Sequence, residues 1–255
     1  MKKDKKELTR REFLKKCAVS APAVLLLAEA ESIFAKNSPE LSDHKEAHYF
    51  GMGIQIDKCI GCGRCVNACK LENSVPDEPF YFRTWVERYV VQVDNEVIVE
   101  SPHGGGEGFP SNISEKGIAR TFFVPKLCNH CANPPCVQVC PVGATFSTQD
   151  GVVLVDEDYC IGCRYCIQAC PYGARYLNPF TKTADKCTFC YHRIKKGSNP
   201  ACVEVCPTKA RIFGEISLRS SPLTRFFRFN KVQVLKPYLN TEPRVYYANL
   251  DGEVR

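Results

Sequence analysis

No segment of this 255-residue chain is long and apolar enough to predict a membrane-spanning helix. The longest weakly apolar stretch, from Cys17 to Ala30, has about 14 residues, whereas a helix needs about 20 to cross the hydrocarbon core of a bilayer. The string C-x-x-C-H, which attaches a c-type haem, does not occur, and the five histidines are scattered. We therefore expect neither a spanning helix nor a covalent haem nor a catalytic histidine cluster.

Cysteine is what the chain has in excess. The sequence is too long, and its 17 cysteines are too few, for a small disulfide-stapled scaffold. The same 17 cysteines are too many for an ordinary globular enzyme. Hydrophobic residues make up 44% of the chain and charged residues 24%, which excludes wholesale disorder. The cysteines are therefore expected to serve a folded, cofactor-carrying protein.

The N-terminal region has the pattern of an export signal. Residues 9–15 read TRREFLK, and a short apolar stretch with small-residue cleavage sites follows them. A twin arginine in this setting is typical of a twin-arginine signal peptide, which we assign to residues 1–35; the alternative is an ordinary basic amphipathic helix. That route carries proteins already folded around their cofactors. It predicts a periplasmic protein at the extracytoplasmic face of the membrane, with cleavage of the signal left open.

Sixteen of the cysteines form four groups. Group I is Cys59, Cys62, Cys65 and Cys69; group II is Cys128, Cys131, Cys136 and Cys140; group III is Cys160, Cys163, Cys166 and Cys170; group IV is Cys187, Cys190, Cys202 and Cys206. Groups I and III have the spacing C-x2-C-x2-C-x3-C, and one gap is longer in groups II and IV. A proline follows the fourth cysteine of every group except group I, where Lys70 takes its place.

This spacing is typical of iron–sulfur proteins. The first three cysteines of a group lie on a tight loop, so their sulfurs can hold one cluster, while the fourth points toward a different cluster. The proline prevents the polypeptide from continuing as a helix. Each cluster then needs a ligand from a second group. The groups therefore act in pairs, and sixteen thiolates make four [4Fe–4S] clusters.

Two other roles for these cysteines explain the pattern less well. Exported Cys-rich proteins often carry disulfides, but a repeated C-x3-C-P string has no disulfide rationale. Zinc sites usually combine two separate C-x2-C pairs rather than a run of three cysteines with a fourth after three residues. Iron–sulfur clusters remain the prediction.

The formal net charge of +6 counts every cysteine as neutral. Thiolates that hold four oxidised clusters would make the protein slightly negative, so the charge does not predict nucleic-acid binding. Several basic residues lie close to the cysteine groups, namely Lys58, Arg64, Arg164, Lys186 and Lys209. They either offset cluster charge locally or belong to the solvated surface.

Internal repeats indicate the fold. CIGCGRCVNAC in group I matches CIGCRYCIQAC in group III, and three fourth cysteines begin a Cys-Pro-x-x-Ala string that leads into a short strand. A hairpin with its turn at Asp150-Gly151 is predicted between groups II and III. We predict an α+β fold of two nested bacterial-ferredoxin-like lobes, each holding two [4Fe–4S] clusters. Groups I and IV (50–75 plus 185–215) form lobe A, and groups II and III (120–184) form lobe B.

Two segments lie outside these lobes. The insertion, residues 76–119, predicts strands at Trp85–Val93 and Glu96–Val99 and a Gly-rich turn at 104–106, which no phosphate-binding Gly-Lys-Ser/Thr string follows. The second segment is the C-terminal extension, residues 216–255. Its first part, residues 217–237, is rich in Arg, Lys and Phe and contains no acidic residue. We interpret it either as a covering strand with a solvated surface or as a docking surface for a partner subunit or the membrane interface.

The strings CNHCANPPCVQVCPVGA, CIGCRYCIQACPYGARY and DKCTFCYHR resemble the four-cluster iron–sulfur subunits of the molybdopterin-oxidoreductase superfamily. Polysulfide, tetrathionate and dimethyl sulfoxide reductases contain such a subunit, as do formate-dependent nitrite reduction systems and the Hdr-like menaquinol oxidoreductase associated with sulfite reduction. The resemblance covers residues 50–75 and 120–215. The string VPDEPFYFRTWVERY and the loop SPHGGGEGFP are most similar to the periplasmic subunit of the sulfite-associated complex (the DsrO type).

The resemblance implies which cysteines share a cluster. Cluster 1 would be held by Cys59, Cys62, Cys65 and Cys206; cluster 2 by Cys187, Cys190, Cys202 and Cys69; cluster 3 by Cys128, Cys131, Cys136 and Cys170; cluster 4 by Cys160, Cys163, Cys166 and Cys140. In this pattern all sixteen cysteines are iron ligands. No cluster keeps an open iron for a substrate, so no catalytic site is expected.

The implied function is electron transfer in anaerobic respiration. The protein would relay single electrons between an integral membrane quinone-interacting subunit and a second redox subunit (a cytochrome, an Hdr-like protein or a molybdopterin protein), and it would contact the membrane through these partners. The menaquinol-linked complex of sulfite and sulfate reduction is the first expectation. A molybdopterin polysulfide-, tetrathionate- or nitrite-type reductase is the second. A free-standing polyferredoxin shuttle is the third, and the extra segments 76–119 and 216–255 argue against it.

Overall fold

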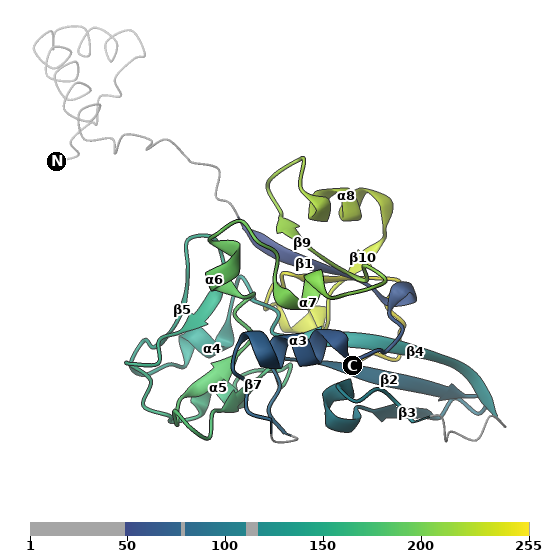
Figure 1. Cartoon of the computed structure of the whole chain (residues 1–255), viewed down its shortest axis with the longest axis horizontal. Helices are drawn as coiled ribbons and strands as arrows, with labels where there is room; N and C mark the ends of the chain where they lie inside the picture. Colours follow the sequence, from purple (N-terminus) through teal and green to yellow (C-terminus); the bar gives the residue numbers. More distant parts are fainter. Residues whose placement is uncertain (1–48, 78–79, 111–116, 255) are drawn as a thin grey trace, which may run out of the picture. The chain divides into compact units, whose positions relative to one another are not determined.

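The computed structural model describes residues 49–77, 80–110 and 117–254. The predicted export signal, residues 1–35, lies outside the described residues. The described elements belong to one compact unit and combine short helices with four small sheets (Figure 1). Within the described ranges, no helix is long and apolar enough to span a bilayer. The mixture of helices and strands agrees with the predicted α+β class.

The helices follow the cysteine loops, and four of them contain the third cysteine of their group. These are α3 (Arg64–Glu72), α4 (Pro135–Gln138), α5 (Tyr165–Gln168) and α7 (Ala201–Glu204), and a further single turn, α6 (Tyr191–Ile194), follows Cys190. Of these five helices, only α3 is longer than about one turn. The sequence between the cysteines is too short for more, so the tight loop and the first helical turn together fix where the sulfurs lie.

The predicted strands after the Cys-Pro-x-x-Ala strings are present. β5 (Thr145–Ser147) pairs antiparallel with β6 (Val153–Val155), and β7 (Arg175–Leu177) pairs antiparallel with β8 (Ala184–Lys186). Gly151 in the turn of the first hairpin has a φ of 77°, which glycine adopts without steric cost. Each hairpin thus connects the end of one cysteine group to the start of the next.

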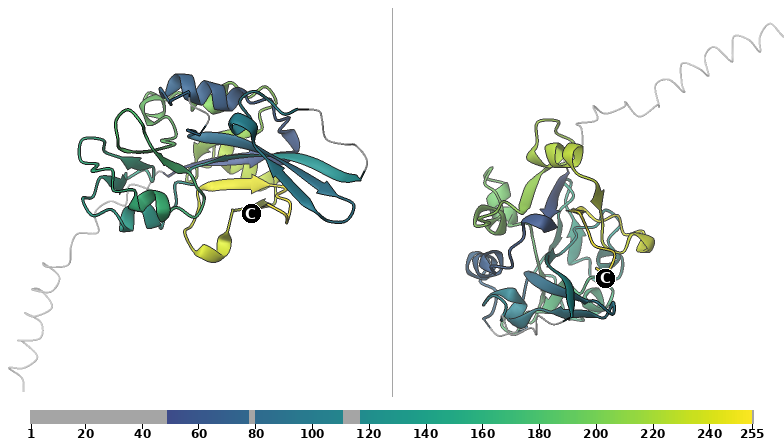
Figure 2. Two further views of the ribbon diagram at one scale, coloured as in Figure 1. Left: turned by 90° about the horizontal axis from the view of Figure 1, so that it is seen from below. Right: turned by 90° about the vertical axis from the view of Figure 1, so that its right-hand side faces the viewer.

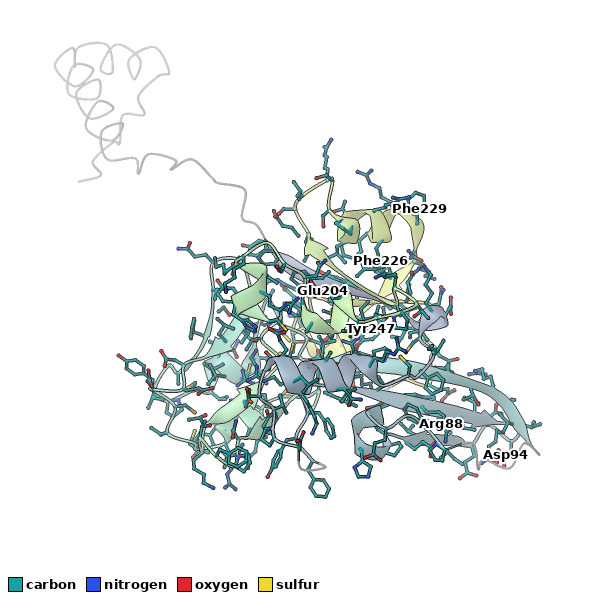
Figure 3. The ribbon with its side chains drawn as sticks, in the orientation of Figure 1. Arg88, Asp94, Glu204, Phe226, Phe229 and Tyr247 are labelled. Carbon is teal, nitrogen blue, oxygen red and sulfur yellow. The ribbon has the colours of Figure 1, made fainter. Side chains whose placement is uncertain are left out.

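A four-stranded sheet joins segments that are far apart in sequence. β1 (Phe50–Gln55) lies between β9 (Arg211–Glu215) and β11 (Val245–Ala248), antiparallel to the first and parallel to the second, and β10 (Val232–Gln233) continues the sheet beyond β11. Tyr247 of β11 is fully buried near the centre of the described part (Figure 3). Because α3 also packs against α7, the segment around group I and the segment after group IV form one structural layer.

Two strands of the insertion, β2 (Thr84–Gln92) and β3 (Val97–Glu100), form a separate sheet with β4 (Ile118–Leu127), most of which belongs to the segment predicted as lobe B; β2 lies in the middle. The predicted hairpin of its first two strands is therefore confirmed. Arg88 of β2, which Figure 3 labels, forms an ion pair with Glu100 across that hairpin. Figures 1 and 2 show this sheet at the opposite end of the described part from α4 and α5.

The start of the C-terminal extension is mainly helical, because it forms α8 (Pro222–Phe229), and the expected covering strand is reduced to the two residues of β10. The side-chain oxygen of Ser221 accepts the backbone N–H of Leu223, and this cap with a proline at the first helical position starts the helix. Phe226 is buried against β1, while Phe229 is 75% exposed (Figure 3). Docking on the outward face of α8 stays a prediction, whereas β11 at the end of the same extension is part of the core.

Gly63, at the start of α3, offers a test of how closely the insertion packs on the group I loop. Its φ is 69°, and a Cβ atom there would lie 2.2 Å from the carbonyl oxygen of Gly105, in the Gly-rich turn Pro102–Gly105. Gly173 has a φ of 63°, but a Cβ atom would meet nothing within 4 Å.

An alanine in the left-handed conformation costs roughly 1–2 kcal/mol at either position. We expect Gly63→Ala to lower the midpoint of thermal unfolding clearly more than Gly173→Ala, because only the first also pushes backbone apart. Scanning calorimetry of the purified variants measures this difference. Equal shifts would show that the Gly-rich turn does not rest on the group I loop.

Candidate metal centres

Three cavities in the described part are each lined by four cysteines from two different groups. One is lined by Cys59, Cys62, Cys65 and Cys206, the second by Cys69, Cys187, Cys190 and Cys202, and the third by Cys128, Cys131, Cys136 and Cys170. Their empty volumes are similar, at about 340, 270 and 320 Å³ respectively. We refer to these cysteines as sets 1, 2 and 3, in the numbering of the predicted clusters.

The remaining cysteines, Cys140, Cys160, Cys163 and Cys166, form set 4. Cys140 follows α4 and Cys166 lies in α5, and these two helices pack against each other. Cys160 and Cys166 belong to one small apolar cluster with Val153 and Ala184. The structure therefore places the members of set 4 on neighbouring elements, close to the protein surface.

All sixteen cysteines are free of disulfide bonds. Backbone N–H groups donate to several of their sulfurs: Thr145 to Cys140 at 3.4 Å, Ala184 to Cys160 at 3.4 Å, Phe189 to Cys187 at 3.4 Å and Ala210 to Cys206 at 3.3 Å. Such bonds stabilise a sulfur that carries negative charge. Two of the four donors come from the residues after a Cys-Pro-x-x string, which explains why this string recurs.

The pKa values of the fourth cysteines show the effect of these donors. Burial alone would raise the pKa of Cys140 and of Cys206, but the backbone N–H groups around Thr145 and Ala210 lower both pKa values below that of an ordinary thiol. The turn after the fourth cysteine thus favours a thiolate, the form that binds iron.

Elsewhere burial dominates. It raises the pKa of Cys59 to about 11, that of Cys131 to about 12 and that of Cys202 to about 11. A buried thiol with such a pKa becomes a thiolate only when a positive charge compensates for its desolvation. These sets therefore need cationic neighbours, whether metal ions or protein side chains.

Three buried cations supply part of that charge. Arg175, Lys186 and Arg211 are 5%, 1% and 2% exposed. Arg175 donates to the sulfur of Cys136 at 3.0 Å. Nε of Arg175 and Nη1 of Arg211 are buried and have no hydrogen-bond partner among the described residues. Since a buried, unpaired cation is costly, these side chains fit sites that hold an anionic four-thiolate cluster.

The sequence identified only one of these three cations. Lys186 was among the basic residues close to the cysteine groups, and it is buried, whereas Lys58, Arg64, Arg164 and Lys209 are exposed. Arg175 and Arg211 follow the alanine of two Cys-Pro-x-x-Ala strings. An arginine repeated at that position was the signal that could have found them.

The two histidines near cysteines have partners other than sulfur. Nδ1 of the buried His130 accepts the backbone N–H of Val153 at 3.1 Å, and its ring stacks on Phe189 with the centroids 3.7 Å apart. His192 forms a 2.6 Å contact with Glu72. Because His130 lies in the group II loop and Phe189 in group IV, their stacked rings join the two predicted lobes.

The sets differ in their access to solvent. Every cysteine of set 2 is buried, and so are three of the four in set 3. Sets 1 and 4 each have one exposed cysteine, Cys62 and Cys163 respectively. Exposed isoleucines precede them in the repeated CIGC string, Ile60 at 58% and Ile161 at 64%.

Comparison with known proteins identifies the class. Two models of 4Fe–4S dicluster domains match the sequence, one at residues 58–144 and the other at residues 119–216. The chain is 42% identical to a subunit of tetrathionate reductase from Salmonella typhimurium, over 95% of its own length and 89% of that protein. It is 37% identical to a polypeptide of polysulfide reductase from Wolinella succinogenes, over 78% of its own length and 94% of that protein. It is 32% identical to the Hdr-like menaquinol oxidoreductase iron–sulfur subunit 1 of Archaeoglobus fulgidus, over 96% of its own length and all of that protein.

The protein is thus a double dicluster ferredoxin with four [4Fe–4S] clusters. It belongs to the family of iron–sulfur electron-transfer subunits that includes these polypeptides of tetrathionate reductase and polysulfide reductase. The predicted cofactors are confirmed. So is the prediction that the protein transfers electrons and has no catalytic site of its own.

Proposed function

We propose that this protein is the electron-transfer subunit of a membrane-associated reductase complex of the tetrathionate or polysulfide type. The identity with the Salmonella tetrathionate reductase subunit exceeds that with the Hdr-like menaquinol oxidoreductase subunit, over a similar share of the sequence. This favours the second of the predicted complexes over the one linked to sulfite reduction. An integral quinone-interacting subunit and a molybdopterin subunit are the proposed partners.

We also propose that sets 1 to 4 hold the four clusters, within the two nested lobes predicted from the sequence. The three cavities support this assignment, because each is lined by the four cysteines of one set. A [4Fe–4S] cluster takes up and releases one electron at a time. The protein contributes the thiolates, the N–H donors to sulfur and a buried surrounding that keeps solvent away from sets 2 and 3.

The observation that carries the proposal is that sets 1 and 4 each have one exposed cysteine, whereas sets 2 and 3 have none. A redox partner can approach Cys62 at set 1 and Cys163 at set 4. Ile60 and Ile161 make the protein surface apolar at these two positions, as expected for a surface that a partner covers. A relay with a separate partner at each end needs this arrangement, whereas a free shuttle needs only one such surface.

The ligand sets are tested by Cys166→Ser. The wild-type protein should contain about sixteen iron atoms per chain, and the variant about twelve if one cluster is lost or about fifteen if that cluster is converted to a [3Fe–4S] form, because Cys166 belongs to set 4 alone. Iron and acid-labile sulfide analysis with EPR spectroscopy of the reduced protein measures this loss. Cys17→Ser is the matched control, since Cys17 belongs to no set. Loss of all four clusters in Cys166→Ser would contradict independent lobes.

The two partner surfaces are tested by Ile60→Glu and Ile161→Glu in the full-length protein. A buried carboxylate at either interface is costly, so each variant should lose a different subunit when the complex is purified from solubilised membranes. Leu71→Glu is the control, because Leu71 is an exposed apolar residue on α3 at 85% exposure. Recovery of the wild-type protein as a lone monomer would contradict the proposal that it belongs to a complex.

We further propose that residues 1–35 direct export by the twin-arginine route, so that the mature protein acts on the periplasmic side. Replacing Arg10 and Arg11 together by lysine should retain the loaded protein in the cytoplasm, because that signal depends on the arginine pair. Replacing Lys2 and Lys3 by arginine keeps the charge elsewhere in the signal and should leave export unchanged. Cell fractionation with immunoblotting decides, and equal periplasmic amounts of both variants would overturn the proposal.

A further inference from the structure

The three buried cations are each placed between a different pair of cysteine sets. None of them forms an ion pair with a carboxylate among the described residues. Arg83 shows the contrast: it also lines the cavity of set 2, but Asp185 neutralises it at 2.8 Å. The charges of Arg175, Lys186 and Arg211 are therefore directed at the thiolates around them.

Arg211 lies between sets 1 and 2. Its side chain lines the cavity of set 1, and Nη2 donates at 2.8 Å to Oγ1 of Thr84, which lines the cavity of set 2. Its guanidinium interacts electrostatically with Cys65 of set 1 and with Cys202 of set 2. An arginine stays charged under all ordinary conditions, so this site holds a permanent positive charge.

Lys186 lies between sets 2 and 3, where the predicted lobes meet. Its ammonium group donates to the carbonyl oxygen of Cys187 at 2.6 Å and to that of Val153, which lines the cavity of set 3. It interacts electrostatically with Cys187 of set 2 and with Cys128 of set 3. Those two sulfurs also interact with each other.

Arg175 lies between sets 3 and 4. Its guanidinium donates to the sulfur of Cys136 and lines the cavity of set 3. It also interacts electrostatically with Cys166 of set 4, which packs in the same small cluster as Cys136. Three cations and four sets therefore alternate in one order: set 1, Arg211, set 2, Lys186, set 3, Arg175, set 4.

We propose that each of these cations is shared by two consecutive clusters and raises the reduction potentials of both. A four-thiolate cluster is anionic, and each one-electron reduction adds a further negative charge to it. A fixed positive charge between two such sites favours the reduced form of each and weakens the repulsion between them. The inference rests on the proposed ligand sets. The three side chains act on the reduction potentials through their charge and do not bind iron.

The test uses the purified, fully loaded protein and a redox titration with soluble mediators, followed by EPR spectroscopy. Arg211→Met, Lys186→Met and Arg175→Met should each lower two of the four midpoint potentials by at least a tenfold change in the reduction equilibrium, which is about 59 mV for a one-electron couple. Arg211→Met and Arg175→Met should affect two separate pairs of clusters. Lys186→Met should affect one member of each pair, so the pattern needs no assignment of signals to clusters.

Charge-keeping variants separate electrostatics from packing. Arg211→Lys, Arg175→Lys and Lys186→Arg keep the positive charge, so the midpoint potentials should stay close to those of the wild type. Lys196→Met removes an exposed charge and should shift no potential, because water screens that charge. Iron loss in a Met variant that its charge-keeping counterpart does not share also supports the proposal. Unchanged potentials in loaded Met variants, or equal iron loss in both members of a pair, would overturn it. Because the readout uses the isolated protein, failure of the proposed complex would not affect the result.

Discussion

The structure depends on one electrostatic constraint, which is that sixteen sulfurs must carry negative charge inside a protein of modest size. Burial opposes that charge, as the raised pKa values of Cys59 and Cys202 show. The protein answers with short-range donors and with buried cations. N–H groups after the Cys-Pro-x-x strings donate to the fourth sulfurs Cys140 and Cys206, and three buried cations lie between consecutive sets of cysteines. The loops, the single-turn helices and the small hairpins are the elements that bring these donors to the sulfurs.

The same constraint explains how the cysteine groups of each predicted lobe are brought together. Group II and group III are separated by one hairpin, so local structure alone brings them together. Groups I and IV have no such connection, and they meet because β1 pairs with β9 and α3 packs against α7. The parallel strand β11 then covers the other edge of β1. The long-range sheet is thus a requirement of the cavities lined by sets 1 and 2, each of which takes cysteines from both groups.

The sequence predicted what depends on spacing and on local turns. The four cysteine groups, the Asp150-Gly151 hairpin and the strands of the insertion all rest on neighbouring residues, and the structure contains them. It did not predict β11, because a parallel strand contributed from a distant segment leaves no periodic signal. It also missed α8, since the Ser221 cap that starts this helix was outweighed by the β-like aromatic composition after it. The sequence did not predict that Arg175 and Arg211 are buried, because only their repetition after the Cys-Pro-x-x-Ala string distinguishes them from surface arginines.

The interleaving of groups I and IV has a consequence for how the protein is made. Ribosomes release a polypeptide from its N-terminus, and the cavity that contains Cys59 lacks its fourth sulfur until Cys206 has emerged. The cavity shared by groups II and III has all its cysteines once Cys170 is available. If the sets hold the clusters as proposed, the sites formed by groups II and III can therefore be filled during synthesis, whereas the cysteines of group I are translated before those of group IV, with which they share sets 1 and 2. Until then they are exposed thiols, which a cell must shield from oxygen and from stray metal ions.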